Sequence, residues 1–593
     1  MAENEIREAR AWPMRAFLLL ALGAFAGLVI HWLTDGFKPW AETPLRLAAA
    51  AFVACGFVAF AFSFERLRWT WSVGFALLVG LVIGLVTWSN GPFGGWGSNE
   101  GWQIFSALLA ITIAVPLFQT ARDAGRPRLD YPSLHAHSWT NIVLWFATWG
   151  FVLVTYLLAQ LLSELFNLIG IHVLRDLLRD SWFNLMLIGA AFGAAAGLFR
   201  DRDTVLAMLQ RVITAILSVL TPFLAVGLVL FVLALPFTGL EPLWSQTKQT
   251  TPILLVCILG AFLLVNATIG PEDEPRAAWL RHSAMALAAV MLPLGAVAAV
   301  SLGKRIGQYG LTPERLWAAV FVFVALIAGA LYLAAIARRR LGWVVDARRA
   351  NIGLALGVCG LALLLALPLL SFGAISARDQ VARLQSGKVS PDKFDWIAMR
   401  FDFGPSGQRA VAQLAREGVS PDIRRLAAKI LALRERYEAR QVQEAAVAAM
   451  RPQSITVVPR PAPAPDAIRA ILYRPGARNQ TAGLCLDEGS CILKWQPGDT
   501  VALALHDDCA PYPKARRYAS CGTKVQLLAL VQGQWQTVDE QPTAATYWAD
   551  AEGMAQDRAI RAGRIEVRDV PSRQVFVDGK PIGPLFTAAQ SSK

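Results

Sequence analysis

Four cysteines near the carboxyl end are the side chains best suited to chemistry in this chain. Cys485, Cys491, Cys509 and Cys521 surround a short run that contains His506, Asp507 and Asp508. Such a set could bind zinc. However, five residues separate Cys485 from Cys491 and eleven separate Cys509 from Cys521, unlike the short C-x2-C hooks of zinc modules. An even number of cysteines in one small segment predicts two disulfides in an oxidising compartment. Of the three possible connectivities we favour Cys485–Cys491 with Cys509–Cys521, because each bond closes a short loop.

A second candidate is the pair His135 and His137, because imidazole is a common metal ligand. Asp130 is the only nearby carboxylate and no cysteine accompanies the pair, so we interpret it as an ordinary polar turn. The sequence also lacks a nucleophile elbow, a phosphate-binding glycine loop and a metalloprotease helix motif. We therefore expect no catalytic residue, metal or cofactor.

Three asparagines, Asn141, Asn184 and Asn266, lie at or near positions that would be inside a membrane. Polar side chains are costly there and are kept either for hydrogen bonds between helices or for function. Hydrogen bonding between helices is the simpler interpretation. Contact with a transported substrate is the alternative.

The three asparagines must be positioned by membrane helices. Eleven stretches before residue 372 are apolar and long enough to cross a bilayer. The predicted spans are 13–33, 45–64, 69–88, 102–120, 139–163, 182–199, 212–235, 251–269, 282–301, 314–336 and 349–371. The charged segment 164–180 is predicted to lie in the membrane interface. The predicted fold is a polytopic α-helical membrane protein of about eleven helices with a lipid bilayer as its surroundings, followed by a small helical region and a β-rich soluble domain.

Glycines recur every fourth residue in the short span 182–199, at Gly189, Gly193 and Gly197. Small residues one turn apart let two helix backbones approach closely. This face therefore predicts tight helix packing, either inside one chain or between two copies in a homo-oligomer.

The net charge of +13 does not predict nucleic-acid binding, because the basic residues lie beside the spans. The intervals that flank the spans, taken alternately and counting the N-terminal segment, hold 18 Arg and Lys in one set and 8 in the other. Basic residues stay on the cytoplasmic side, so this bias predicts a cytoplasmic N-terminus and an external carboxyl region. The first apolar run continues through Trp32, so we expect a retained span and not a cleaved signal peptide.

The bundle is predicted to occupy residues 1–371, with three further parts outside the membrane. Residues 372–450 show helical spacing of Ala and Leu, and 451–465 form a Pro-rich linker. Residues 466–593 are predicted to be β-rich and disulfide-bonded, with Ile468–Leu472 as one strand and Asp578-Gly579 as a hairpin turn.

Several short motifs resemble a known family. They are Tyr131-Pro132-Ser133-Leu134, Ser138-Trp139-Thr140-Asn141, Val265-Asn266-Ala267, Phe394-Asp395-Trp396 and Arg400-Phe401-Asp402. Together they resemble the bacterial multi-pass membrane family known as domain of unknown function 4153. The resemblance covers most of residues 100–410 and implies a bacterial inner-membrane protein, but it implies no activity.

Three functions fit these features. The first is a non-enzymatic envelope protein whose external domain, residues 466–593, binds a protein partner or a cell-wall component. The second is a carrier or flippase for a lipid-like or neutral solute, since the spans hold few ionisable groups. The third is a transferase on the external face, which the first external loop, 34–44, disfavours because it holds only Asp35 and Glu42.

Overall fold

The structure is a computed structural model of the whole chain. It describes residues 14–34, 43–91, 97–201, 203–246, 249–270, 277–391, 393–440, 442–443, 455–458, 462–473, 483–485, 490–507, 521–538, 546–548, 555, 558–560, 562, 564–565, 572–577 and 580–587. The chain divides into two compact units, residues 1–390 with 394–432, and residues 391–393 with 433–593. Each unit is described by itself.

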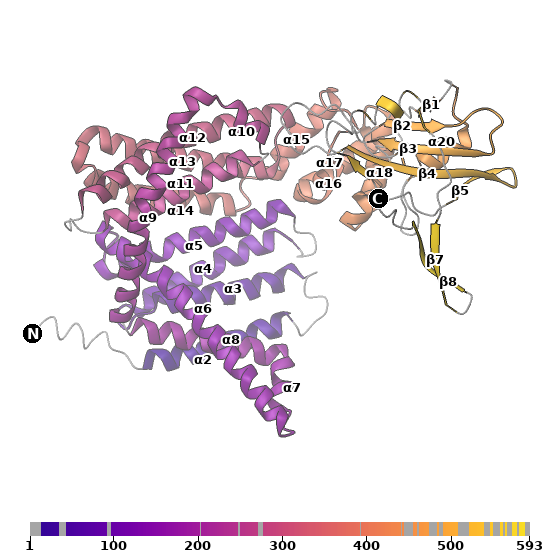
Figure 1. Ribbon diagram of the computed structural model, residues 1–593. Helices are drawn as coiled ribbons and strands as arrows, with labels where there is room; N and C mark the ends of the chain where they lie inside the picture. The colour runs from indigo at the N-terminus through magenta and orange to yellow at the C-terminus, as the bar shows by residue number, and fades with distance from the viewer. Residues whose placement is uncertain are drawn as a thin grey trace, which may run out of the picture. The chain divides into compact units, whose positions relative to one another are not determined.

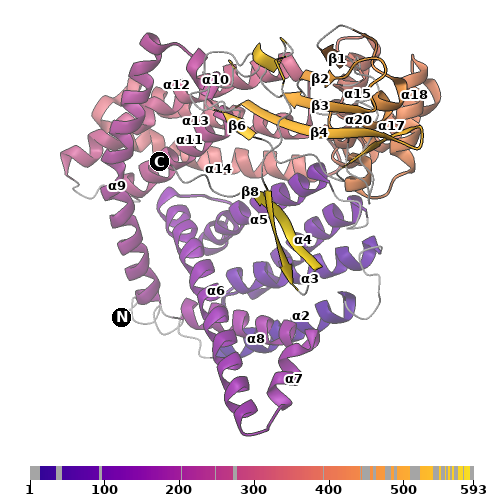
Figure 2. The ribbon, with the colours of Figure 1, turned by 45° about the vertical axis from the view of Figure 1, so that its right-hand side comes forward.

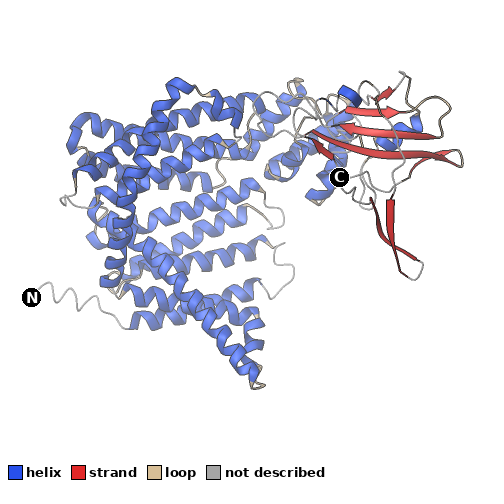
Figure 3. Cartoon of the chain, viewed as in Figure 1, coloured by secondary structure: helices blue, strands red, loops and turns tan. Residues whose placement is uncertain are grey.

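The first unit contains eleven helices that are long and apolar enough to cross a membrane, counted over the described residues (Figures 1 and 3). They are α2 (Met14–Thr34), α3 (Pro44–Ser63), α4 (Trp69–Ser89), α5 (Ser98–Ala124), α6 (Tyr131–Leu168), α8 (Ser181–Arg200), α9 (Asp203–Thr238), α11 (Thr250–Ile269), α12 (Ala278–Tyr309), α13 (Pro313–Arg339) and α14 (Val344–Ala366). The short helices α7 (Val173–Arg179) and α10 (Glu241–Gln246) connect spans. The predicted fold class and number of spans are confirmed, and the protein is a multi-pass membrane protein.

Several spans are longer than their apolar runs suggest. Helix α6 has 38 residues, which at 1.5 Å per residue is about 57 Å, nearly twice the thickness of a bilayer core. It runs obliquely across its neighbours in both views (Figures 1 and 2), so a long helix can still cross once. The range 164–180, predicted as one interfacial element, is divided between the end of α6 and α7.

Local sequence sets where these helices begin. The Asp130 carboxylate accepts a hydrogen bond from the Ser133 backbone N–H at 3.0 Å, and a proline follows in the first turn of α6. Thr312 caps α13 in the same way, through the Arg315 N–H at 3.3 Å. A cap oxygen satisfies a backbone donor that the helix itself leaves free, and proline suits the first turn because it has no N–H to lose.

The spans form two bundles with separate apolar cores. Helices α2–α6 and α8 surround one core, which includes Leu19, Leu144 and Phe192. Helices α9 and α11–α14 surround the other, which includes Met291 and Tyr332. The bundles meet mainly where α5 lies beside α14 (Figures 1 and 2).

Helices α2 and α8 make the closest contact in the first bundle. A Cβ atom added to Gly189 would collide with the Gly23 carbonyl oxygen, and one added to Gly193 would collide with that of Leu19. Gly197 faces Ala16 in the same way. The glycine stripe of α8 therefore packs on α2 of the same chain.

Four more helices complete the first unit: α15 (Phe372–Gln385), α16 (Trp396–Phe401), α17 (Gly404–Glu417) and α18 (Pro421–Ala432). Helices α17 and α18 form an amphipathic pair whose apolar faces, with Val411, Leu414 and Ile430, are buried. Burying these faces against each other and against α15 and α16 explains why they form helices outside the spans.

The second unit is built on a six-stranded sheet. Its strands are β1 (Ile455–Val458), β2 (Ser490–Lys494), β3 (Val501–Asp507), β4 (Cys521–Val531), β5 (Gln534–Thr537) and β6 (Thr546–Trp548). The order is β1-β2-β3-β4-β5, with β6 also paired to β4, and all pairs except the parallel β1–β2 are antiparallel. Strands β7 (Ser572–Val577) and β8 (Lys580–Thr587) pair separately as the hairpin that Asp578-Gly579 predicts.

Two details of the predicted second unit are corrected by the structure. Ile468–Leu472 is not a strand but part of helix α20 (Asp466–Leu472), whose Ile468 and Leu472 are fully buried in the core beside the sheet. The spacing of four between these two residues is helical, and a short apolar run cannot separate the two alternatives. The range 451–465, predicted as a linker, also contains β1, which lies at the edge of the sheet. Prolines beside a strand are compatible with an edge position, because an edge strand leaves part of its N–H groups unpaired.

The glycine contact between α2 and α8 can be tested by one substitution. We expect Gly189→Ala to destabilise the folded protein by about 1–3 kcal/mol, because the added methyl group forces the two backbones apart. The thermal unfolding midpoint of purified protein measures the effect. The matched control is Gly357→Ala in α14, where an added Cβ would meet no atom within 4 Å. Equal midpoints for the two variants would contradict the contact.

Candidate functional site

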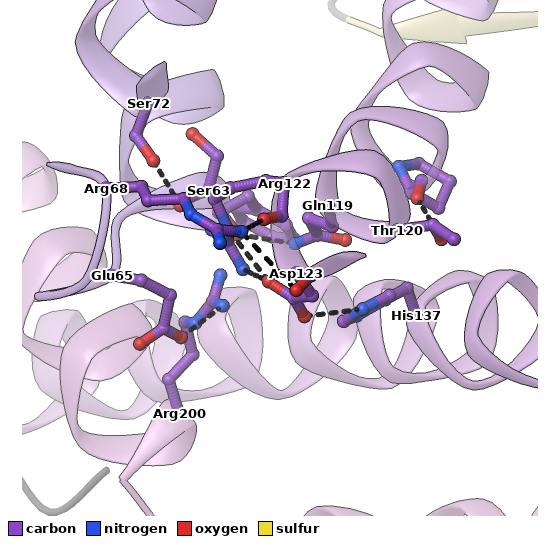
Figure 4. Close-up of polar contacts among 12 residues, drawn as sticks. Ser63, Glu65, Arg68, Ser72, Gln119, Thr120, Arg122, Asp123, His137 and Arg200 are labelled. Carbon is purple, nitrogen blue, oxygen red and sulfur yellow. Dashed lines mark hydrogen bonds and ion pairs between the residues drawn. The ribbon is translucent and has the colours of Figure 1, made fainter. Parts of the chain in front are cut away.

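One end of the first bundle holds a largely buried group of charged side chains, here called the Glu65 cluster and made of Arg15, Glu65, Arg200 and Asp201. Figure 4 shows two of them, Glu65 and Arg200. The turn between α3 and α4 carries Glu65, which lies 2.8 Å from Arg15 Nη2 and 2.9 Å from Arg200 Nη2. Arg15, from the start of α2, is 2% exposed. The cluster therefore ties the ends of α2, α3, α4 and α8 together.

The electrostatics of Glu65 favour its ionised form. Burial alone would raise the pKa of the Glu65 carboxyl, but attraction to Arg200, Arg15 and Arg122 and a hydrogen bond from Arg200 hold it below its ordinary value. A carboxylate that stays charged between arginines is a structural ion pair. It is poorly suited to act as a proton carrier near neutral pH.

Two arginines next to this cluster cap helix ends (Figure 4). The Arg122 guanidinium donates to the carbonyl oxygen of Ser63, the last residue of α3, and Arg68 donates to the carbonyl oxygen of Arg122 near the end of α5. The Ser72 hydroxyl also donates to Ser63, at 2.6 Å. Carbonyl groups at the end of a helix have no partner within it, so these bonds satisfy them at a point where the helix dipole favours a cation.

The first turns of α6 connect this end of the first bundle to the second. On one side, Asn141 Nδ2 donates to Gln119 Oε1 of α5 at 2.7 Å, and His137 Nε2 lies 3.1 Å from Asp123 Oδ2. On the other side, the Tyr131 hydroxyl lies 3.5 Å from Asn266 Oδ1 of α11. The residues of α6 that make these contacts, Tyr131, His137 and Asn141, all lie within residues 131–141.

A hydrogen-bonded group, here called the Asn266 network, lies at this junction. It is made of Asn266, Tyr332 and Asn351 of the second bundle and Tyr131 of the first. Asn266 Nδ2 donates to the Tyr332 hydroxyl at 3.0 Å and to the Phe262 carbonyl at 2.9 Å. Its Oδ1 accepts from Asn351 Nδ2 at 2.7 Å, and the Tyr332 hydroxyl donates to Asn351 Oδ1 at 2.7 Å. Both polar atoms of the Asn266 side chain are thus occupied by the protein itself.

The other two predicted amides also bond to the chain. Asn141 is paired with Gln119, which in addition donates to the Phe62 carbonyl at 2.6 Å. Asn184 Nδ2 donates to the Leu178 carbonyl at 2.7 Å and so joins the start of α8 to the end of α7. All three amides therefore link elements of the bundle, and the structure shows no two of the three in contact with each other.

The opposite end of the spans is joined to α15 by contacts that we call the α15 clasp. Asp379 accepts from the Leu311 N–H at 2.7 Å, Gln380 donates to the Tyr309 and Leu311 carbonyls, and Arg383 donates to the Gln308 carbonyl at 2.7 Å. One face of α15 thus bonds the backbone of the α12–α13 turn. The clasp fixes the first helix after the spans to the second bundle.

In the second unit, Cys485 and Cys491 form a disulfide, so a bond of the predicted kind is present in the carboxyl-terminal region. Both cysteines are buried in the core next to α20. Cys509 lies outside the described residues and Cys521 is described only as the first residue of β4, so their pairing stays a prediction. Over the described parts of the chain, no three His, Cys, Asp or Glu side chains gather as metal ligands do.

Sequence reasoning missed the Glu65 cluster and most of the Asn266 network. In the sequence, Arg15 and Arg200 are distinguishable only as basic residues beside spans. The carboxylate of Glu65, so close to a span end, is the one signal that indicates an ion pair there. Tyr131 lies in the motif Tyr131-Pro132-Ser133-Leu134. Tyr332 and Asn351 carry no signal in the sequence, because only the fold brings α13 and α14 to Asn266.

The role of Glu65 can be tested by pH. Because its folded pKa is depressed, its contribution to stability is present above its unfolded pKa, near 4.5, and is lost as pH falls through the lower folded value. We expect Glu65→Gln to lower the free energy of unfolding by about 2 kcal/mol at pH 7, and the gap to the parent protein to close in acid.

The matched control for this test is Glu164→Gln, which removes an exposed carboxylate and should leave the unfolding midpoint unchanged. A Glu65→Gln protein as stable as the parent at pH 7 would show that the ion pairs contribute nothing.

Comparisons with known proteins give a family and no activity. Neither the curated proteins nor the solved structures include a match to this chain. The family model described as Domain of unknown function (DUF4153) matches residues 47–413, which spans the bundle from α3 to α14 and continues into α17. Since this match covers more than half of the 593 residues, the chain belongs to the family.

Proposed function

We propose that this protein is a non-enzymatic scaffold in the bacterial inner membrane, whose carboxyl-terminal unit lies outside the cytoplasm and binds an envelope protein or a cell-wall component. The membrane bundles anchor and orient that unit. The proposal concerns a binding function and assigns no reaction to the chain.

The observation that carries the proposal is the state of two amides in the spans, Asn266 and Asn141. A carrier needs polar groups that can exchange bonds with a solute, whereas both polar atoms of Asn266 are bonded to Phe262, Tyr332 and Asn351. Asn141 is bonded to Gln119 in the same way. Polar groups used in this manner hold helices together, as an anchor requires.

Two independent features support an external position for the second unit. The basic residues beside the spans are distributed unevenly, which favours a cytoplasmic N-terminus, and eleven crossings then lead outside. The Cys485–Cys491 disulfide persists only in an oxidising compartment. The α15 clasp supports a fixed starting point for the chain that leads to this unit.

The sidedness is tested by reporter fusions to the full chain. An alkaline phosphatase joined after Lys593 should be active, because that enzyme needs an oxidising exterior, and a cytoplasm-dependent fluorescent protein at the same place should stay dark. The opposite pair of results would put the carboxyl-terminal unit in the cytoplasm and end the proposal.

The binding role is tested by a chain that stops after Ala432, where the first compact unit ends. We expect this truncated protein to insert with the abundance and thermal midpoint of the parent bundle, yet to leave the growth or envelope phenotype of a deletion strain uncorrected. The full chain with a tag after Lys593 is the control. Complete correction by the truncated protein would move the function into the membrane bundle.

A further inference from the structure

A group of arginines outside the sites described above lies where α13 turns into α14. Helices α12, α13 and α14 and the short 3-10 helix η3 (Arg340–Gly342) contribute six of them, here called the basic patch: Arg281, Arg338, Arg339, Arg340, Arg348 and Arg349. Two bonds join parts of this region: Arg281 Nη2 of α12 donates to the Leu341 carbonyl at 3.0 Å, and Arg339 Nε donates to Asp346 Oδ2 at 2.9 Å. Asp346 is the one carboxylate in these bonds.

The protein uses only part of this charge. Arg348 donates to the carbonyls of Ile269 and Gly270 and so caps α11, while Arg339 and Arg349 share Asp346. Over the described residues, the side chains of Arg338 and Arg340 are exposed and have no hydrogen-bond or ion-pair partner. Capping the dipole at the end of α13 needs a cation in the last turn, which Arg339 already supplies without Arg338.

Arg340 also holds an unfavourable backbone conformation. Its φ is +48°, in the region that side chains other than glycine rarely adopt. Glycine would adopt this φ without strain, and a glycine does occur two residues later at Gly342. Strain of this kind at an exposed, unpaired side chain points to a use for that side chain.

The surroundings of the basic patch match the border between acyl chains and headgroups. Leu341, between the arginines, is 58% exposed, and Trp279, two residues before Arg281 in α12, is 54% exposed. Exposed apolar side chains beside arginines are better placed in the membrane interface than in water or against a nucleic acid. In the interface an aliphatic side chain enters the lipid and guanidinium groups meet phosphates.

We propose that the basic patch is a binding site for the phosphate headgroup of an anionic membrane phospholipid, with Arg338 and Arg340 as its main ligands. The patch lies at the shared end of two spans, the depth at which lipid phosphates occur. A guanidinium group can bind two phosphate oxygens at once, so Arg338 and Arg340, two residues apart where α13 ends, can together hold one headgroup. This site does not depend on the function proposed for the carboxyl-terminal unit.

The test uses the full chain carrying Arg338→Gln and Arg340→Gly, purified in nanodiscs. Glycine relieves the strain at position 340, so the loss of the guanidinium is separated from any damage to the fold. The control carries Arg126→Gln and Arg128→Gln, two exposed arginines before α6 that lie outside the patch. Bound phosphatidylglycerol is counted by native mass spectrometry, and the unfolding midpoint is measured with phosphatidylcholine alone and with added phosphatidylglycerol.

We expect the patch variant to bind phosphatidylglycerol about thirtyfold more weakly than the parent, the effect of removing two basic side chains from an anionic surface. The midpoint in phosphatidylcholine alone should not fall. The control should keep the lipid binding of the parent.

Three outcomes would overturn the proposal. The first is equal phosphatidylglycerol binding by the patch variant and the parent. The second is stabilisation of the parent by inorganic phosphate alone, which would indicate a site for a free anion. The third is a lower midpoint of the patch variant in phosphatidylcholine with unchanged lipid binding. This would indicate that the arginines serve an acidic segment of the chain itself, such as the sequence Glu272-Asp273-Glu274.

Discussion

The core of a bilayer contains no water, so a polar side chain buried between membrane helices needs a partner within the protein. This constraint organises the junction of the two bundles. Asn266, Tyr332 and Asn351 bond to one another in the second bundle, and Asn141 bonds to Gln119 in the first. The start of α6 contributes to both groups, through Tyr131 and Asn141, and so links the two bundles.

The same need for partners governs the helix ends. Arginines beside the spans are usually interpreted as markers of orientation, but several of them also satisfy carbonyl groups. Arg122 caps α3, Arg68 caps α5 and Arg348 caps α11, while Arg15 and Arg200 neutralise Glu65. One type of side chain thus caps helix ends and joins them to one another. The unpaired Arg338 and Arg340 stand apart from this pattern.

The number and approximate positions of the spans could be predicted from the sequence, because length and apolarity alone decide which segments can cross a bilayer. The ends of the helices could not, since α6 begins eight residues before the predicted span, at a cap formed by Asp130. Local pattern misassigned Ile468–Leu472, where burial in the core favours a helix over a strand. The Glu65 cluster and the Asn266 network depend on residues far apart in the chain, which only the packing of helices brings together.

The central claim is that the polar side chains between the spans act as a bonded network that stabilises the bundle. A double-mutant cycle with Asn266→Ala and Asn351→Ala tests it most directly, by comparing the unfolding free energies of both single variants and the double variant. The account predicts a coupling of about 1 kcal/mol, with the double variant less destabilised than the two single losses added together. Strictly additive losses would contradict it, because the two side chains would then contribute independently.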